Sequence, residues 1–453
     1  MLNTKKFLRI IIGIALSVLI GAGLMIFVYS LPTERVVRNV QAGLQIYERE
    51  GIYPAWGSGE HSKLDNFTDA IMLLEVTHPI AGNVQAAMLN PRFGLTQDEK
   101  PVDALIKVLH DDTNGLSEIN YPRYWHGYLL ILKPMLMATQ IQHVRMLLAY
   151  TDFILFVVAL LMFYKIFGTP HAIAFAAVVM TINLVSVSMS FQFSSIYVVT
   201  LTAIIIMLKK NRRLIDDELY CYFFAAIGII VAFTDLLTYP IFSVGLPLIV
   251  FYLLNKDTQL KVMGGLLISW GVGYVGMWSG KWIAAYVLTG QNVLMDGLHQ
   301  VMVHSRVVSD HAAAGWQISF LSAIQRNIAT LGHGPIRIFL FAGIIALLYV
   351  LISRRHLITR RIVLPYLLPA ALPFIWYVLA SGHSHIHAFF TYRGLAVTVF
   401  ALTCLAIDLT REDHVRDGCR DKQADNRPLK EEDKQFGQVD GDFGAENQAA
   451  DFR

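Results

Sequence analysis

The chain has 453 residues, of which 55% are hydrophobic and 16% are charged. Soluble globular domains carry about 25% charged residues, so this composition excludes an ordinary water-soluble protein and indicates a core of lipid-facing helices. The net charge of +3 says little about partners. No soluble segment combines a basic patch with interleaved aromatic residues, so nothing in the sequence indicates a nucleic-acid partner.

The first long apolar run, from Leu8 to Leu31, follows Lys5 and Lys6. It is longer than the hydrophobic region of a secretory signal peptide, and no small-residue cleavage pattern follows it before Pro32. We therefore interpret this run as a retained membrane anchor.

A helix needs roughly 20 apolar residues to cross a bilayer, and the chain contains about ten such segments. Their approximate cores are residues 8–30, 144–167, 172–190, 193–208, 219–238, 240–254, 262–284, 337–353, 362–380 and 389–408. The third and fourth are separated only by "SFQFSS", and the sixth is short. The predicted fold class is an all-α integral membrane protein with about ten transmembrane helices and a large helical first loop outside the cytoplasm.

Short basic loops predict the orientation, because lysine and arginine collect on the cytoplasmic side of polytopic proteins. With the N-terminus in the cytoplasm, the inside loops carry "KKNRR" (209–213), "NKDTQLK" (255–261), "SRRHLITRR" (353–361) and "TREDHVR" (410–416). The outside turns "SFQFSS", "TYP" and "SGHSHIH" carry no lysine or arginine. We therefore predict a multi-pass protein of the cell membrane, with both termini cytoplasmic and the active surface extracytoplasmic.

Residues 1–408 are predicted to form one membrane domain with two extracytoplasmic regions, residues 32–143 and 288–336. In the first region, "TERVVRNVQAGLQIYERE", "DNFTDAIMLLEV" and "PVDALIKVLH" have helical patterns. The apolar stretch 124–140 is interrupted by Lys133 and Pro134, so we expect an interfacial or re-entrant segment. Residues 409–453 are polar and lack apolar periodicity, which predicts a disordered cytoplasmic tail.

Several ionisable residues are predicted to lie on the outer side or at the outer ends of spans. Such residues are costly at membrane depth and commonly mark a cavity or a functional path. In chain order they are Asp65, Asp69, His126, Asp235, Lys281 and Arg393. Their common location predicts one outward-facing cavity.

Each of these residues also has a structural interpretation. Asp65 is a candidate helix N-cap, and Asp69 lies one turn later on the same face. Asp235 suits an interhelical hydrogen bond, and Lys281 can reach the interface beside two tryptophans. Arg393 is harder to explain in this way, since a guanidinium in an apolar span before a glycine suits a phosphate or carboxylate ligand.

The stretch "GHSHIH" contains His383, His385 and His387. On a strand all three share a face, whereas on a helix only the outer pair does. No nearby carboxylate or cysteine completes a metal-ligand set, so no metal ligands are predicted. We expect His383 and His387 to hydrogen-bond a polar substrate.

The sequence contains no Walker A motif, no G-x-G-x-x-G and no G-x-S-x-G. These absences argue against nucleotide-driven chemistry and against a hydrolase nucleophile elbow. An enzyme that works outside the cytoplasm without ATP needs a pre-activated substrate. A polyprenyl-phosphate carrier, whose phosphate lies at the outer interface, meets that need.

The arrangement resembles the GT-C class of integral-membrane glycosyltransferases, which have many spans, a long first extracytoplasmic loop with an acidic motif, and polyprenyl-linked sugar donors. The segments "LDNFTDAIML", "YPRYWHGYLLILKPML", "FTDLLTYP" and "HSHIHAFFTYR" also resemble those of a group of bacterial polytopic membrane proteins placed near that class. This second likeness covers most of residues 1–408.

The resemblance implies transfer of a sugar from a polyprenyl-phosphate donor to a glycan or lipid acceptor at the cell surface. The acidic motif of the class falls on Asp65, with Asp69 behind it. The class often has adjacent or D-x-D acids soon after the first span. Here the two acids are four residues apart and lie further along the chain. Glu60, elsewhere in the first loop, is another candidate for the role.

In this mechanism Asp65 would act as general base, and Arg393 with Lys281 would hold the leaving phosphate. Asp235 and His126 would bind sugar hydroxyls. The expected partners are the lipid-linked donor, the acceptor and membrane lipids. The cofactor is left open, and a divalent cation such as Mg²⁺ or Mn²⁺ is compatible with this chemistry.

Two other functions fit the same features. A surface-polysaccharide polymerase or ligase also has many spans and a large outside loop. A transporter or flippase would place its binding groups nearer the bilayer midplane, often on broken helices in inverted repeats. A membrane acyltransferase fits less well, because no clear acyl-transfer histidine motif is present.

Overall fold

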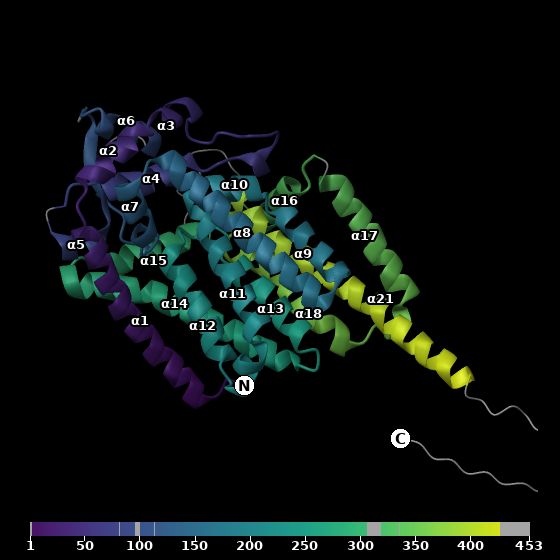
Figure 1. Cartoon of the computed structure of the whole chain (residues 1–453). Coiled ribbons are helices and arrows are strands. Elements are labelled where there is room, and N and C mark those ends of the chain that lie inside the picture. Colours follow the sequence, from purple (N-terminus) through teal and green to yellow (C-terminus); the bar gives the residue numbers. More distant parts are fainter. Residues whose placement is uncertain are drawn as a thin grey trace, which may run out of the picture. The chain divides into compact units, whose positions relative to one another are not determined.

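The computed structural model describes residues 2–80, 82–95, 100–112, 114–305, 319–334 and 336–425, with side chains described up to residue 411. Within these ranges nearly all regular structure is helical (Figure 1). The two strands, β1 (Pro91–Leu95) and β2 (Leu116–Asn120), form one antiparallel pair, in register from Pro91 opposite Asn120 to Leu95 opposite Leu116. The chain is an all-α membrane protein.

Seven helical segments in the described residues are long and apolar enough to cross a membrane. They are α1 (Thr4–Ser30), α8 (Ile141–Phe167), α11 (Phe191–Asp216), α14 (Leu260–Thr289), α17 (Ile336–Ser353), α18 (Arg360–Leu379) and Ala388–Arg411, which includes most of α21 (Leu395–Asp425). Three shorter apolar helices, α9 (Thr169–Thr181), α12 (Tyr220–Thr234) and α13 (Phe242–Leu254), account for the other predicted spans.

The predicted third span, residues 172–190, is not one helix. Helix α9 ends at Thr181, Asn183 has a left-handed backbone with φ of 59°, and the short helix α10 (Leu184–Met189) follows. The Asn183 side chain accepts from the Ser186 N–H and donates to the His61 carbonyl oxygen at 2.9 Å. Asparagine tolerates this backbone conformation and caps helices, which explains the interruption.

The segment between α1 and α8 folds into short helices around the strand pair. They are α2 (Glu34–Ala42), α3 (Gln45–Glu50), the 3₁₀ turn Glu60–Ser62, α4 (Asn66–Thr77), α5 (Asn83–Leu89), α6 (Pro101–Leu109) and α7 (Leu129–Ala138). The three predicted helices are confirmed, with the first divided at Gly43. The strand pair was not predicted. Helix α7 contains Pro134 and has 10 residues, too few to cross a bilayer.

The second predicted outside region contains α15 (Val293–His304) and α16 (Phe320–Leu331), while residues 306–318 and 335 lie outside the described residues. The remaining elements are a 3₁₀ turn at Arg355–Leu357, α19 (Ser381–Ile386), α20 (Ala388–Thr391) and a 3₁₀ turn at Tyr392–Gly394. Helix α21 is described to Asp425. Residues 426–453 lie outside the description, so the expected disorder there stays a prediction.

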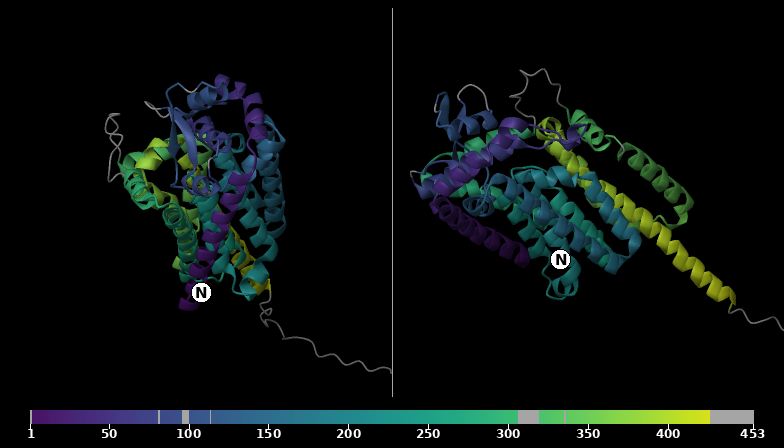
Figure 2. Two further views of the ribbon diagram at one scale, coloured as in Figure 1. Left: turned by 90° about the vertical axis from the view of Figure 1, so that its left-hand side faces the viewer. Right: turned by 45° about the horizontal axis from the view of Figure 1, so that its top comes forward.

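Helix α12 packs closely on α14, and α1 lies along α14 (Figure 1) (Figure 2 gives further views). A Cβ atom placed on Gly228 of α12 would lie 2.2 Å from the Trp270 carbonyl oxygen. One placed on Gly273 of α14 would lie 2.2 Å from the Ala225 carbonyl oxygen. Small residues thus let the two backbones touch, as is common between membrane helices.

Polar contacts link the connecting segments in two separate groups. Lys6 pairs with Glu218 at 2.7 Å, Asn211 bonds Asn255, and Arg361 pairs with Asp257 at 2.8 Å. These contacts join the N-terminus to the segments with the basic clusters. The segment after α1 instead contacts the opposite end of α14, where both Trp278 and Trp282 donate to the Arg123 carbonyl oxygen.

Candidate functional site

The first turn of α11, the SFQFSS segment (Ser190–Ser195), is the meeting point of several predicted site residues. The Asp65 N–H donates to Ser190 Oγ at 3.1 Å, and the Gln192 side-chain amide donates to Asp65 Oδ2. The Phe191 N–H donates to Asp69 Oδ1 at 3.0 Å. A helix N-terminus has unpaired N–H groups and a partial positive charge, so it favours carboxylates in this position.

Asp65 is buried, with 2% of its surface exposed, and it is the N-cap of α4. Its Oδ1 accepts from the Thr68 N–H at 3.1 Å, and its Oδ2 accepts from the Thr68 hydroxyl at 2.9 Å. Burial raises the pKa of Asp65 to about 6, although the hydrogen bonds from Thr68 and the nearby Arg393 oppose this shift. The N-cap role considered from the sequence is therefore present, and both carboxylate oxygens are engaged.

Asp69 belongs to a buried ion network that the sequence did not predict. Arg145, in the first turns of α8, donates to Glu50 Oε2 at 3.0 Å and to the Asn66 side-chain oxygen at 2.8 Å. The second oxygen of Asp69 lies 3.9 Å from Arg145 Nη2. Burial raises the pKa of Asp69 well above its usual range, with Arg145 opposing. This network ties α4 to α8, and the signal for it was an arginine at the start of an apolar span.

Arg393 contacts the SFQFSS segment at Phe193 and is fully buried. Its Nε donates to the Ile182 carbonyl oxygen at 2.9 Å, and its guanidinium carbon lies 4.3 Å from the centre of the Phe193 ring. Its Nη1 donates to the Phe389 carbonyl oxygen at 3.2 Å. Nη2 has no hydrogen-bond partner among the described residues. A buried N–H without a partner is costly, so this group is suited to a ligand.

Asp235 organises the turn between α12 and α13. Its carboxylate accepts from the Thr238 N–H at 2.9 Å and from the Thr238 hydroxyl. The same turn contacts the SFQFSS segment, because the Tyr239 hydroxyl donates to the Phe193 carbonyl oxygen at 2.6 Å. Asp235 therefore shapes the turn, and its contacts are those of a capping residue.

His383 and His387 share one face of a helical turn, with ring centres 4.8 Å apart. His383 Nε2 donates to the Leu237 carbonyl oxygen at 2.7 Å, which ties "GHSHIH" to the Asp235 turn. Burial, with His387 and His304 nearby, holds the pKa of His383 well below its usual range. Within the described residues, no group of three histidine, cysteine or acidic side chains is arranged to hold a metal ion.

The remaining two predicted residues lie at the far end of α4. His126 has a left-handed backbone with φ of 58° and contacts Glu75, which lies in the last turn of α4. Lys281 Nζ donates to the Ala87 carbonyl oxygen at 2.9 Å and to the Asn90 side-chain oxygen at 2.8 Å. Lys281 thus anchors α5 to α14. Asp65 and Glu75 are ten residues apart, about 15 Å along the helix axis.

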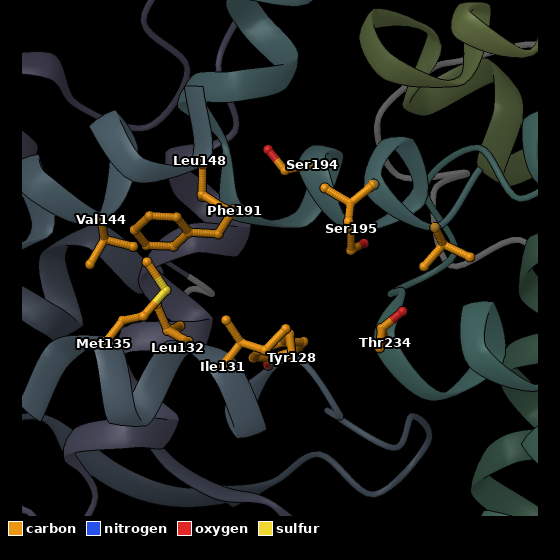
Figure 3. Close-up of a pocket in the computed structure, with 12 residues that line it drawn as sticks. Tyr128, Ile131, Leu132, Met135, Val144, Leu148, Phe191, Ser194, Ser195 and Thr234 are labelled. Atoms are coloured by element: carbon orange, nitrogen blue, oxygen red, sulfur yellow. The ribbon is translucent and has the colours of Figure 1, made fainter. Parts of the chain in front are cut away.

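An apolar pocket lies between α7, α8 and α11 (Figure 3). It is lined by Tyr128, Ile131, Leu132, Met135, Val144, Leu148, Phe191, Ser194, Ser195, Val198, Val199 and Thr234. None of the eight predicted site residues is in this wall. Three wall residues nevertheless bond buried carboxyl groups, since Phe191 contacts Asp69, Tyr128 donates to Glu75, and Ser194 donates to Asp152 at 3.0 Å.

The structure thus brings the predicted residues into two clusters joined by α4. In the first cluster, Asp65, Asp69 and Arg393 contact the SFQFSS segment directly. Asp235 and His383 belong to the same cluster through the turn between α12 and α13. His126 and Lys281 lie with the second cluster. Comparisons with protein-family models, curated proteins and solved structures found no match to this chain.

Proposed function

We propose that this protein is a membrane glycosyltransferase of the GT-C kind, which moves a sugar from a polyprenyl-phosphate donor to an acceptor at the outer face of the cell membrane. The observation that carries the proposal is that two consecutive residues in the first turn of α11 contact Asp65 and Arg393. Gln192 contacts the acid, and Phe193 stacks under the guanidinium.

The two side chains supply complementary chemistry. Arg393 has one buried N–H group without a partner, and a phosphate oxygen is a fitting acceptor for it. Stabilising the charge that develops on a leaving phosphate is a major source of rate enhancement. Asp65, with its pKa raised to about 6, is ionised at neutral pH yet basic enough to take a proton from an acceptor hydroxyl.

The reaction requires a rearrangement at Asp65, because both of its oxygens already accept hydrogen bonds. Donor binding at Arg393 would displace the Gln192 amide from Oδ2, and the acceptor hydroxyl would take the place of that amide. Catalytic hydrogen bonds commonly reach their working geometry only in the substrate complex. The apolar pocket beside Phe191 supplies a lipid-compatible surface at the same turn.

The test measures transfer of radiolabelled sugar in proteoliposomes supplied with a panel of polyprenyl-phosphate monosaccharides. Asp65→Asn keeps a side chain that caps helices but removes the base, so transfer should fall by about 10²–10⁴-fold. Arg393→Lys keeps the charge but loses the planar donor, and should lower transfer also. Asp103→Asn, an exposed acid in the first turn of α6, is the matched control and should leave transfer unchanged.

A folded and active Asp65→Asn protein would remove the base assignment. Incorporation only from a preassembled lipid-linked glycan would indicate a polymerase or ligase. Movement of the lipid-linked sugar across the bilayer without any transfer product would indicate a flippase.

A further inference from the structure

Helices α15 and α16, in the connection between α14 and α17, each carry exposed apolar side chains on one face. On α15 these are Leu294, Met295, Leu298 and Val301, with exposed fractions from 38% for Val301 to 63% for Met295. At 3.6 residues per turn, the four positions lie within about 120° of the helix circumference. No charged residue of α15 lies in this arc. The four side chains form the apolar stripe of α15.

Helix α16 shows the same pattern. Phe320, Leu321 and Ile328 are 57%, 53% and 49% exposed. They lie within about 100° of the circumference and form the apolar stripe of α16. Arg326 is the only charged residue of this helix, and it lies about 170° from the middle of the stripe. Single exposed apolar residues are common on protein surfaces, whereas a continuous apolar face indicates a partner.

The charged residue of each helix is tied to the segment between α1 and α8. Asp296 of α15 accepts from Arg123 Nε at 2.9 Å, and it lies about 160° from the middle of its stripe. Arg326 of α16 pairs with Glu60, with 3.4 Å between Nη2 and Oε2. These ion pairs orient both helices, so each apolar stripe faces away from the residue that holds the helix.

Buried contacts of the two helices agree with this orientation. Gly297 of α15 is buried, and a Cβ atom there would lie 2.5 Å from the ring of Trp282 in α14. Asn327 of α16 is buried, and its amide donates to the Ser384 carbonyl oxygen at 2.8 Å. Each helix therefore packs on the protein with one face and leaves its apolar stripe uncovered.

Both helices are joined closely to membrane spans. Only residues 290–292 separate α14 from α15, and only residues 332–335 separate α16 from α17. The last turns of α14 expose apolar side chains too, with Tyr286 at 51% and Val287 at 71%. Trp282, which packs on α15, belongs to a residue type that collects at the membrane–water interface. The exposed apolar surface of the span thus reaches the start of α15.

A lipid bilayer is the partner that fits these stripes. A stable protein–protein interface buries about 800 Å² on each partner, and three or four half-exposed side chains on a helix offer much less. Apolar surface in water is unfavourable, and the short connections keep both helices close to the bilayer. A helix with one apolar face can lie in the membrane surface with that face among the lipids.

We propose that α15 and α16 are interfacial helices, whose apolar stripes lie in the membrane leaflet at the Trp282 end of α14. Many interfacial helices are rich in lysine and arginine on their polar face. Helix α15 has neither residue, and the one arginine of α16 pairs with Glu60. Burial of apolar surface, and not attraction to anionic lipids, therefore holds the two helices at the membrane.

Electron paramagnetic resonance of the full-length protein in lipid nanodiscs tests this placement. Nitroxide labels are attached to Leu298→Cys and Ile328→Cys in a background without the three native cysteines. Collisions of each label with oxygen, which concentrates in hydrocarbon, are compared with collisions with a water-soluble nickel chelate. Both labels should lie about 5–10 Å inside the boundary between head groups and acyl chains.

His299→Cys and Ala329→Cys are the matched controls, because each position is exposed and follows a labelled residue but lies outside the stripe. Their labels should collide readily with the nickel chelate. If the Leu298 and Ile328 labels meet nickel as often as their controls do, the stripes lie in water and the proposal is wrong. Shielding of both labels from oxygen as well as from nickel would mean that protein covers the stripes, which also contradicts a lipid partner.

Lipid composition separates apolar burial from attraction between charges. The depth of both labels should be the same in nanodiscs of phosphatidylcholine alone and in nanodiscs that also contain phosphatidylglycerol, because the stripes carry no basic residue. A depth that increases with the anionic lipid would show that basic groups hold the helices at the membrane, against the proposal. Neither measurement depends on sugar transfer.

Discussion

Asp65 illustrates how one carboxylate can serve two helices at once. It caps α4 through Thr68, and it also accepts from Gln192 in the first turn of α11. Asp69 does the reverse, since it lies in α4 and accepts from the first N–H group of α11. The N-termini of two helices thus share two buried acids, whose hydrogen bonds tie α4 to α11.

The raised pKa of Asp65 predicts a specific dependence of stability on pH. The folded protein binds a proton at Asp65 with a pKa of about 6, whereas an unfolded aspartate has a pKa of about 3.9. Between these values the folded state binds more protons, so stability should fall as the pH rises from about 4 to about 6, by about 3 kcal/mol in total. Asp65→Asn should lose this component of the pH dependence.

Thermal unfolding in detergent at a series of pH values measures this effect. Asp103→Asn changes an exposed acid and should follow the wild type at every pH. If the stability of the wild type and of Asp65→Asn changes in parallel over this pH range, burial of Asp65 is not the cause of the pH dependence.

At the residue scale, the sequence supplied the candidates but not their partners. Asp65 was recognisable as an N-cap because the local pattern of asparagine, threonine and apolar residues follows it. Its bond to Gln192 joins residues 127 positions apart, and no local pattern predicts such a contact. Arg145 and Glu75 were missed for a related reason, since each is a single charge whose partners come from other elements.

At the element scale, glycines decide how closely α12 and α14 approach. Gly273→Ala should lower stability by about 1–3 kcal/mol or more, because the new methyl group meets the Ala225 carbonyl oxygen rather than a movable side chain. Gly271→Ala, on the same helix with open space around it, should be neutral or slightly stabilising. The midpoint of unfolding in a denaturing detergent compares the two variants directly.

Equal losses in Gly271→Ala and Gly273→Ala would show that helix propensity, and not contact between the two backbones, determines the effect. The contact itself could not be predicted from the sequence. Lipid-facing helices are apolar on all sides, so their hydrophobic pattern does not reveal which face packs on a neighbour.

The SFQFSS segment shows a second limit at this scale. From the sequence it was a short connection between two spans, whereas the structure places it at the N-terminal turn of α11, with contacts to α4, α8 and the Asp235 turn. Its serines and glutamine are short polar side chains in an apolar setting, and they matter because buried polar groups must find partners.

At the scale of the whole molecule, the contacts between connecting segments predict which of them share a membrane face. The segments with basic clusters contact one another, and the segment after α1 contacts the opposite end of α14. This grouping matches the one expected from the positive-inside rule. The orientation with both termini in the cytoplasm stays a prediction.

Labelling of intact cells with a membrane-impermeant maleimide tests this orientation. In a background without the three native cysteines, Asn120→Cys in β2 should react in intact cells, because that segment is predicted to lie outside. Arg212→Cys, in the exposed last turns of α11, should react only after the membrane is opened. The reverse pattern would invert the topology and move the proposed sugar-transfer site to the cytoplasmic face.

Hydropathy and composition were sufficient to predict an all-helical membrane chain and the approximate position of nearly every apolar helix. The reason is that a span satisfies its backbone hydrogen bonds within itself, so its signal is local. The division of the polar residues into two clusters, the apolar pocket between α7, α8 and α11 and the contact between Glu75 and His126 arose only in the assembled molecule. Each of these features depends on side chains that meet across separate helices, and the free energy of such contacts is set by burial and distance, which the order of residues along the chain does not record.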